Sequence, residues 1–533
     1  MRGIRGRLSR SSMVVGLLGL VLLAFGWMAR VDRIEHMLPY CQHPDEHVWV
    51  SKALGMVKSG NLNPRRFTKP SFMVYLNAAT LALTSAASTD AALAPRALPK
   101  SCYPYFKHAG VILPLRYVYA VVSLAALFLA ALANRKLARH LLRERSFADA
   151  AFLLTIALGL GSPFYLRLST WYLNVDILGC LTATAVIAHG VLLVERLPAR
   201  IFALSAGVLV GFCVGTKYNL FPVLAAPTLA ILLFHRRSWL VNLALLGAAA
   251  LVAFLVTTPY ALLTPAAFYR DLSHEAAHYA TGAGSPTRER GLEMFLAYGK
   301  NVSDGYGSGV LLLALVGLVE SLRRSWRLTA MVFSYPLLLW LYMSLQRTFF
   351  ARNLLILELA IPMLATLGAF ELVQAFGWRM RGSRLPAAAV SALAFCCLSA
   401  LVLTTWPLKA SKAAFIAHPE SRNRAVDWVL EHAPKKSTVL VASELNMDVR
   451  RLKKRFRVVD FQTKSKSLKR LRRKHPHALA ILPVLDDPRA GIRVPADEPL
   501  LRAGKIPVRA RDLGRKAAQK ALSGDPKLVV VRL

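Results

Sequence analysis

The chain contains 533 residues, 55% of them hydrophobic, and its mean hydropathy of +0.42 is too high for an ordinary soluble protein. The formal net charge of +39 first suggests nucleic-acid binding. Outside the C-terminal tail, however, the basic residues gather in short clusters at the ends of apolar runs, where they orient a protein in a bilayer. The composition therefore predicts a polytopic α-helical membrane protein without a nucleic-acid partner.

Apolar runs near the roughly 20 residues needed to cross a bilayer recur along the chain. The first follows an arginine-rich tail, and no small-residue cleavage site comes after it, so we expect an uncleaved first span. We predict eleven spans, at residues 13–29, 111–133, 148–165, 175–194, 201–215, 220–234, 240–257, 309–319, 328–345, 354–375 and 387–403. A further apolar segment, 72–83, is expected to lie in the membrane interface.

Basic residues mark alternate ends of these spans. With a cytoplasmic N-terminal tail, every inner loop carries basic residues, as the positive-inside rule requires. These loops hold Arg135, Lys136, Arg139, Arg143 and Arg145, then Arg196 and Arg200, Arg236 and Arg237, Arg323, Arg324 and Arg327, and finally Arg379, Arg381 and Arg384. We therefore expect a cytoplasmic N-terminus.

Residues 30–110 form a first outer loop that is long for a simple connector. Two adjacent carboxylates, Asp45 and Glu46, open a helix-like segment in this loop, and Lys69 follows a break at residues 58–64. Acidic and basic groups therefore lie close together at a membrane face. Acidic residues in a first turn are also what any helix N-terminus favours, so a capped surface helix is an equally good interpretation of this segment alone.

The predicted topology sorts the ionisable residues near the membrane by side. Ten of mixed sign fall on the outer face, namely Asp45, Glu46, Lys69, Asp176, Lys217, His274, Glu275, His278, Arg347 and Arg352. Ionisable groups beside spans usually face a polar cavity, although any one of them alone is an ordinary interfacial anchor. Together they suit a phosphate-bearing ligand, because cations bind the phosphate and a carboxylate is left to activate a nucleophile.

After residue 403 the pattern changes to short strands and a helix. Residues 424–432 predict a helix, and residues 438–442, 456–460, 478–484 and 528–531 predict strands. We therefore divide the chain into a membrane domain, 1–406, and a small outer α/β domain, 407–533. The outer domain is strongly basic, which fits a solvated surface at least as well as a patch that binds lipid phosphates.

Several short motifs follow one another along the predicted spans. They are Asp45-Glu46, the break at 58–64, Lys69-Pro70, Asp176, Gly215-Thr216-Lys217-Tyr218, Thr258-Pro259-Tyr260 and Arg352-Asn353-Leu354-Leu355. This ordered set resembles the GT-C membrane glycosyltransferases, in particular glycosyltransferase family 39, which includes protein O-mannosyltransferases and the lipid A aminoarabinose transferase. Trp49 and Ser71 depart from the Tyr and the second Pro that family members often have.

The resemblance implies an inverting hexosyl or pentosyl transferase that moves a sugar from a polyprenyl-phosphate donor to a lipid, glycan or protein acceptor. It also implies a multi-pass protein of the bacterial inner membrane with its active site on the outer face. The roles it implies are Asp45 and Glu46 as catalytic acids, with Asp45 the base, Lys69, Lys217 and Arg352 on the donor phosphate, and Asp176, His274, His278 and Tyr218 in support.

Two other classes of function stay open. His274, Glu275 and His278 match the H-E-x-x-H pattern of zinc proteases, in which the two imidazoles bind the metal and the carboxylate is the base. This pattern easily occurs by chance, and no distinct third ligand follows it. A solute transporter is the third hypothesis, although we find no inverted-repeat symmetry. The sequence demands no cofactor and leaves a role for a divalent metal open.

Cysteines fall into two groups. Cys180, Cys213, Cys396 and Cys397 lie within apolar runs and are expected to be buried. Cys41 and Cys102 are the only cysteines outside the predicted spans, and both lie on the oxidising side of the membrane. We predict a disulfide between them, with two free thiols as the alternative.

Overall fold

The computed structural model describes residues 10–35, 38–40, 43, 45–84, 109–142, 145–170, 173–282, 286–379, 399, 402–403, 406, 421–442, 445, 447–461, 470, 473–475, 477–483 and 528–532. Cys41 and Cys102 lie outside these residues, so their disulfide stays a prediction. Cys180 and Cys213 are buried, as expected.

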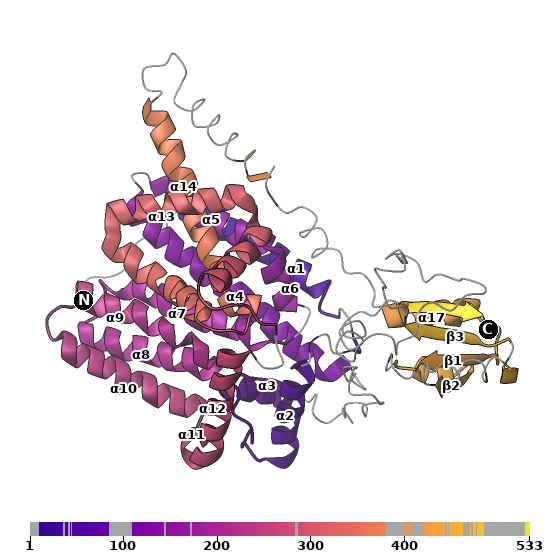
Figure 1. Cartoon of the computed structure of the whole chain (residues 1–533). Coiled ribbons are helices and arrows are strands. Elements are labelled where there is room, and N and C mark those ends of the chain that lie inside the picture. Colours follow the sequence, from indigo (N-terminus) through magenta and orange to yellow (C-terminus); the bar gives the residue numbers. More distant parts are fainter. Residues whose placement is uncertain are drawn as a thin grey trace.

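Most of the described chain is helical (Figure 1). The helices are α1 (Arg10–Val31), α2 (Glu46–Ser59), α3 (Phe72–Leu83), η2 (Ala109–Val111), α4 (Leu113–Leu141), α5 (Arg145–Gly161), α6 (Pro163–Thr170), α7 (Val175–Leu193), α8 (Ala199–Thr216), η3 (Tyr218–Leu224), α9 (Ala225–Phe234), α10 (Trp239–Thr257), α11 (Tyr260–Leu263), α12 (Pro265–Thr281), α13 (Leu292–Ser344), η4 (Ala351–Leu354), α14 (Leu357–Arg379), α17 (Ser421–His432) and α18 (Arg450–Lys453). Within the described residues, 7 helices are long and apolar enough to cross a membrane, or up to 8 if the bent pair α5 and α6 is one span. The chain is therefore a polytopic α-helical membrane protein.

The helix α13 contains two of the predicted spans, 309–319 and 328–345. A straight helix of its 53 residues would measure roughly 80 Å, far more than the roughly 30 Å hydrocarbon core of a bilayer. Non-helical backbone at Gly307 and Ser325 interrupts it, and the rings of Phe295 and Trp340 stack with centroids 4.7 Å apart. The chain therefore turns back within α13, which is one reason why fewer long helices are counted than spans predicted.

The remaining predicted spans differ in how fully they are described. Residues 220–234 form η3 and α9, a helical segment of the shorter class, and residues 354–375 begin in η4 and continue into α14. The last predicted span, 387–403, lies almost entirely outside the described residues. The interfacial segment 72–83 is helix α3, and its 12 residues are too few to cross a bilayer.

Small residues let two helix pairs approach closely. A Cβ atom on Gly207 or Gly211 of α8 would lie 2.5 or 2.4 Å from backbone oxygens of α10. In the same way, a Cβ atom on Gly317 of α13 or Gly368 of α14 would lie 2.0 Å from a backbone oxygen of the other helix. Because lipid tails are as apolar as the helices, such close van der Waals packing is what holds helices together in a bilayer.

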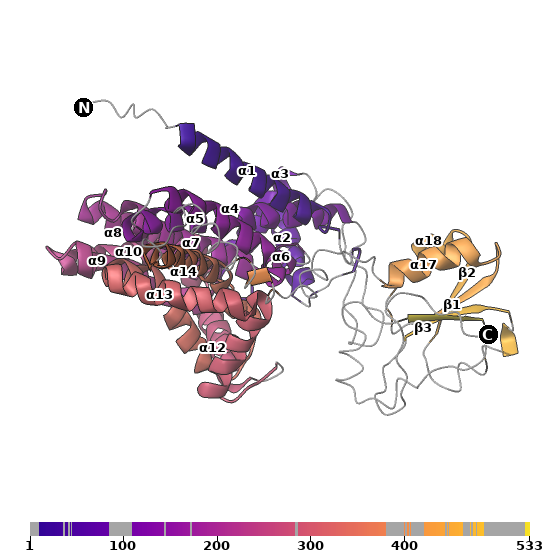
Figure 2. The same ribbon diagram turned by 90° about the horizontal axis from the view of Figure 1, so that it is seen from above.

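A small sheet lies to one side of the helices in both views (Figures 1 and 2). Its strands are β1 (Thr438–Ala442), β2 (Arg457–Phe461), β3 (Leu479–Pro483) and β4 (Leu528–Arg532), in the order β2-β1-β3-β4. β1 is parallel to β2 and β3, whereas β4 is antiparallel to β3. The strands and α17 share a separate hydrophobic core that includes Val429, Leu440 and Ile481. The predicted α/β fold of this region is therefore confirmed.

The C-terminal sheet region contacts the chain between α1 and α2. The Arg422 guanidinium lies 3.5 Å from the ring centroid of Tyr40, and the Tyr40 hydroxyl accepts a hydrogen bond from the backbone N–H of Asp448 at 2.9 Å. Nearby, the Asn423 side chain donates to the Leu38 carbonyl at 2.8 Å. The sheet region therefore holds the segment that leads into α2.

Candidate active site

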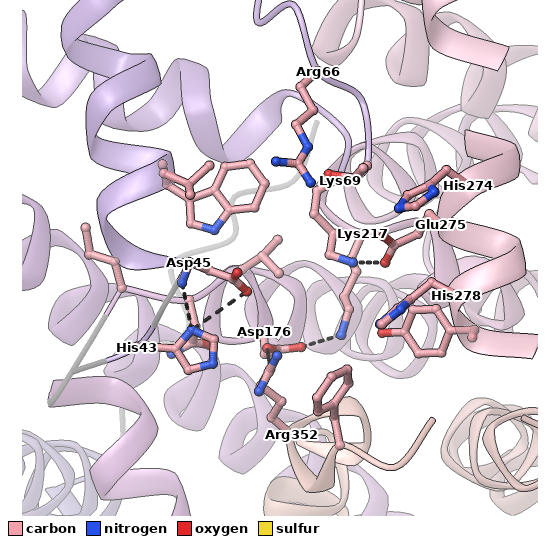
Figure 3. Close-up of a pocket in the computed structure, with 18 of the residues that line it drawn as sticks. His43, Asp45, Arg66, Lys69, Asp176, Lys217, His274, Glu275, His278 and Arg352 are labelled. Carbon is pink, nitrogen blue, oxygen red and sulfur yellow. Dashed lines mark hydrogen bonds and ion pairs between the residues drawn. The ribbon is translucent and has the colours of Figure 1, made fainter. Parts of the chain in front are cut away.

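A cavity of about 510 Å³ lies between α2, α12 and the start of α7 (Figure 3). It is lined by His43, Asp45, Val48, Trp49, Arg66, Thr68, Lys69, Leu173, Asn174, Val175, Asp176, Lys217, His274, Glu275, His278, Tyr279, Pro286, Phe350 and Arg352. The predicted site residues among them are Asp45, Lys69, Asp176, Lys217, His274, His278 and Arg352. Segments more than 300 residues apart in sequence thus contribute to one cavity, which Glu46 and Tyr218 do not line.

Asp45 occupies the N-cap position of α2 but does not cap the helix with its side chain. Its backbone carbonyl accepts bonds from Val48 and Trp49 at 3.1 and 3.2 Å, while its carboxylate points into the cavity (Figure 3). The side chain is 48% exposed. A helix N-terminus favours a nearby acidic side chain, and here that side chain remains accessible to a ligand.

His43 is the nearest titratable neighbour of Asp45. Its Nδ1 accepts a hydrogen bond from the Asp45 backbone N–H at 3.2 Å and lies 3.7 Å from the Asp45 carboxylate. Burial, followed by the positive charge of Arg352, lowers the pKa of His43 to about 4, although Asp45 and Asp176 oppose the shift. His43 is therefore neutral at pH 7.

Glu46, the second acid of the pair, points away from the cavity into the protein. Its Oε1 accepts bonds from the Arg116 guanidinium at 3.0 and 3.2 Å and from the Leu173 backbone N–H at 3.1 Å. Both charged side chains are buried, and Arg116 also donates to the Ile34 carbonyl at 2.8 Å. This geometry suits a residue that fixes the start of α2 rather than one that touches a ligand.

Asp176 forms the centre of the cavity floor. Its Oδ1 accepts a hydrogen bond from Lys217 Nζ at 2.6 Å, and its Oδ2 lies 3.2 Å from Arg352 Nε. Lys217 also donates to Asn353 Oδ1 at 2.7 Å, and Tyr279 donates to the same oxygen at 3.2 Å. The side chains of Asp176 and Lys217 are each only 4% exposed, so this ion pair at the cavity floor is almost completely shielded from solvent.

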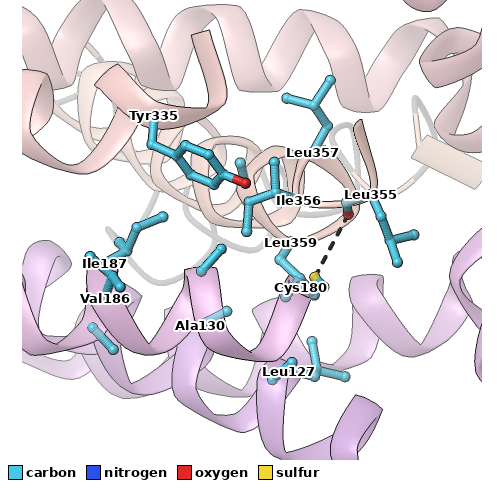
Figure 4. Packing of buried hydrophobic residues seen from close by; sticks show 14 of the residues in the cluster. Leu127, Ala130, Cys180, Val186, Ile187, Tyr335, Leu355, Ile356, Leu357 and Leu359 are labelled. Atoms are coloured by element: carbon cyan, nitrogen blue, oxygen red, sulfur yellow. Dashed lines mark hydrogen bonds between the residues drawn. The ribbon is translucent and has the colours of Figure 1, made fainter. Parts of the chain in front are cut away.

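The floor rests on closely packed helices. Asp176 lies in the first turn of α7, where the Asn174 side chain caps the helix by accepting from the Ile177 backbone at 3.1 Å. One turn further along α7, Cys180 packs against Leu355, with its sulfur 3.9 Å from the Leu355 carbonyl (Figure 4). Because Leu355 directly follows η4, this packing fixes Asp176 relative to Arg352.

The H-E-x-x-H residues face the cavity from α12 (Figure 3). Glu275 forms an ion pair with Lys69, and both side chains are largely buried. Lys69 also lies 5.6 Å from the ring centroid of Tyr279. Among the described residues, no group of three or more His, Cys, Asp or Glu side chains is arranged to bind a metal ion. His274 and His278 therefore have no third ligand within this part of the chain.

Tyr218 and Asp271 position the segment before Lys69. The Tyr218 hydroxyl donates to the Phe67 carbonyl at 2.9 Å, and the Asp271 carboxylate accepts from the Phe67 backbone N–H at 2.8 Å. Both polar groups of one peptide segment are thus held by side chains that are distant in sequence. Tyr218 does not line the cavity, but its hydrogen bond to Phe67 orders the loop that carries Arg66 and Lys69.

His43, Arg66 and Tyr279 line the site but were not among the residues expected from the sequence. Asn353 belongs to the Arg352-Asn353-Leu354-Leu355 motif, but its bonds to Lys217 and Tyr279 were not predicted. Arg66 lines the cavity, is exposed and forms no ion pair with any described residue. Its position three residues before Lys69 in the first outer loop was the available signal. Tyr279, directly after the H-E-x-x-H segment, was similarly close to a recognised motif.

Charged groups of both signs therefore meet in a single cavity. The cations are Arg66, Lys69, Lys217 and Arg352, and the carboxylates are Asp45, Asp176 and Glu275. Two carboxylates are already engaged in ion pairs with cations of the same cavity, whereas Asp45 and Arg66 are not paired in this way. Such a site can accept an anion and still present a free carboxylate as a proton acceptor.

Comparison with known proteins identifies the fold. No protein-family model and no curated protein matches the sequence. Among solved structures, ArnT from Cupriavidus metallidurans bound to undecaprenyl phosphate matches with a TM-score of 0.52 and 14% identity over 89% of this chain and 94% of that chain. The apo state of the same protein gives 0.50 and 14% over 88% and 93%. The Archaeoglobus fulgidus oligosaccharyltransferase gives 0.46 and 11% over 79% and 60%.

The two ArnT matches, with the helices described above, define the class of the molecule as a polytopic membrane protein with a GT-C-like fold. The similarity to the Cupriavidus metallidurans ArnT extends over almost the whole of both chains. At 14% identity it establishes the fold, whereas the function has to be argued from the cavity.

Proposed function

We propose that the chain is a membrane glycosyltransferase that takes a sugar from a polyprenyl-phosphate donor. The observation that carries the proposal is the cavity itself, where an accessible carboxylate, Asp45, lies beside four cations. A lipid-linked phosphate supplies the anion that such cations bind. The fold adds support, because the Cupriavidus metallidurans ArnT, which matches with a TM-score of 0.52, was crystallised with undecaprenyl phosphate.

The proposed reaction is a single displacement with inversion at the anomeric carbon. The acceptor hydroxyl attacks this carbon, a new carbon–oxygen bond forms, and the bond from the sugar to the phosphate oxygen breaks. The electron pair leaves with the polyprenyl phosphate, and the proton of the hydroxyl passes to the Asp45 carboxylate. The leaving phosphate needs little further help, because cations stabilise the charge that it gains.

The cations divide into two groups in this mechanism. Lys217 and Arg352 are held in place by Asp176, so they offer fixed positive charge at the floor. Arg66 and Lys69 lie on the loop between α2 and α3, and Arg66 forms no ion pair with any described carboxylate that an anion would have to displace. We infer that the floor orients the phosphate and that the loop adds contacts when the donor is bound.

The sugar, the acceptor and the face of the membrane belong to the same proposal. Basic inner loops support a cytoplasmic N-terminus, and that orientation puts the cavity at the outer face of a bacterial inner membrane. An acceptor at that face is a lipid, glycan or protein of the cell envelope. A metalloprotease is less well supported, because Glu275 is engaged with Lys69.

The proposal is tested by mass analysis of envelope glycans and glycolipids from cells with the protein, without it, and with its Asp45→Asn variant. We expect one sugar modification that is present with the wild type and absent in the other two. In parallel, purified protein with a polyprenyl-phosphate sugar should release polyprenyl phosphate only when the acceptor fraction is added. Identical envelopes in all three strains, together with no release by the purified protein, would contradict the proposal.

A further inference from the structure

A second cavity lies away from the candidate active site, between α1 and α5. It has a volume of about 220 Å³, and its lining includes Leu22, Phe25, Gly26, Ala157, Leu160 and Arg30. None of these residues lines the cavity that contains Asp45. All but Arg30 are apolar. We call this cavity the α1–α5 groove: it is lined by apolar side chains of two helices and has one cation, Arg30, at its end.

The guanidinium of Arg30 is incompletely satisfied. The side chain is buried, with 0% of the residue exposed. Its Nε donates to Ser123 Oγ at 2.8 Å and its Nη1 donates to the Gly26 carbonyl at 3.0 Å, but Nη2 has no hydrogen-bond partner. The Tyr165 ring lies 5.8 Å away, and Arg30 forms no ion pair with any described residue. Within the described parts of the chain, this positive charge is thus buried without a counter-ion.

Burying an unpaired charge costs several kcal/mol, and buried charges in proteins are normally paired. Arg30 lies in the last turn of the membrane helix α1, where a helix end reaches the lipid headgroups. The groove runs from there to Leu22, which is roughly 12 Å deeper along the helix axis. A phosphate at the end of the groove would give Arg30 a counter-ion, and an acyl chain along the groove would cover its apolar lining.

We propose that the groove between α1 and α5 binds a bilayer glycerophospholipid, with the lipid phosphate paired to Arg30 and an acyl chain along Leu22 and Phe25. The rest of α1 agrees with this assignment, because only 17% of its span is buried against the protein. The bound lipid supplies contacts that α1 lacks. This site is independent of the donor cavity and does not rest on the proposed glycosyltransferase activity.

The test measures the Tm of the full-length protein in detergent as phosphatidylglycerol is added. The wild type should show a concentration-dependent rise, and Arg30→Gln should weaken the apparent Kd about tenfold to a hundredfold, as expected for a lost charge-assisted hydrogen bond. Arg33→Gln, one turn further along, is the matched control and should keep the rise. Each shift is measured from the variant's own lipid-free Tm.

A second variant leaves the charge in place and fills the groove. Ala157 is exposed on α5, so Ala157→Phe should block the acyl chain without disturbing the buried packing, and it should also abolish the rise. Stabilisation by undecaprenyl phosphate should persist in both variants if the donor uses the other cavity. Equal responses to phosphatidylglycerol in the wild type, Arg30→Gln and Ala157→Phe would overturn the proposal, as would loss of only the undecaprenyl phosphate response.

Discussion

Asp45 and Asp176 line the same cavity but have opposite surroundings. Asp176 is 4% exposed and lies between Lys217 and Arg352, whereas Asp45 is 48% exposed and, among the described residues, has the neutral His43 as its one close ion-pair neighbour. Protonation of a carboxylate that is paired with two cations is unfavourable, because it would break both ion pairs. A carboxylate without such partners is left free to contact an acceptor hydroxyl. The contrast supports the proposal that Asp176 organises the cavity and that Asp45 accepts a proton.

The same contrast separates Asp45 from its neighbour Glu46. The two are adjacent in sequence, yet the carboxylate of Glu46 is fully buried against Arg116. Proximity in sequence therefore does not indicate a shared role. One acid of the pair is left free for a ligand, and the other holds the helix N-terminus that presents it. Five substitutions test these roles.

The largest expected effect is the loss of stability in Glu46→Gln. This change leaves the Arg116 guanidinium buried without its counter-ion, and breaking a buried pair in this way typically costs about 3–5 kcal/mol. We expect a large fall in the free energy of unfolding, measured as Tm in detergent. Asp45→Asn is the matched control and should change Tm little, because its carboxylate makes no comparable contact. A stable Glu46→Gln protein would show that the Arg116 pair does not hold α2.

Lys217→Ala should act on ligand binding. Lys217 Nζ bonds to Asp176 and Asn353, so its loss removes one cation from the floor and leaves Asp176 paired with Arg352. We expect affinity for undecaprenyl phosphate to fall about tenfold to a hundredfold. Lys300→Ala, on an exposed turn of α13, is the control and should bind normally. Unchanged affinity in Lys217→Ala would exclude the floor as the phosphate site.

The sequence was sufficient for those parts of the fold that depend on local pattern. The apolar runs and the strand segments after residue 438 follow from hydropathy and periodicity, and sorting charges by membrane side brought Asp45, Asp176 and Lys217 onto one face. The partners of these residues could not be found in this way. Glu46 and Arg116 are 70 positions apart, and only helix packing brings them together.

Helix breaks and loop conformations also could not be predicted from the sequence. Ser325 has an ordinary sequence context, yet its non-helical backbone lets α13 turn back. Arg66 reached the cavity because Tyr218 and Asp271 hold Phe67, and no local pattern encodes those two contacts. Such positions depend on tertiary packing, which overrides local propensity.

Glu275→Gln should have a smaller effect than the changes at Glu46 and Lys217. It removes the ion pair with Lys69 but leaves that cation free to bind an anion. We expect sugar transfer to fall by less than about tenfold, because Lys69 stays available to the donor phosphate. A zinc protease would instead lose all activity, because its glutamate activates the attacking water. Proteolysis that disappears in Glu275→Gln, without any sugar transfer in the wild type, would favour the protease.

The smallest expected effect is a change in the pH dependence of Tm. Burial lowers the pKa of His43 from 6.5 to about 4, so between these values the unfolded chain binds a proton that the folded chain does not. Stability from this group is therefore complete above pH 6.5 and declines as the pH falls toward 4. His43→Gln should flatten the dependence of Tm on pH in this window. An unchanged profile would mean that His43 is not buried as described.

The central claim is that Asp45, and not Asp176, accepts the proton of the acceptor. The most direct measurement compares turnover of purified wild-type and Asp45→Asn protein with a polyprenyl-phosphate sugar and the acceptor, alongside affinity for undecaprenyl phosphate. Loss of a general base lowers rates by about 10² to 10⁴, so we predict that kcat falls by that factor while Kd for the carrier stays within a few-fold. Near wild-type turnover by Asp45→Asn protein would contradict the account.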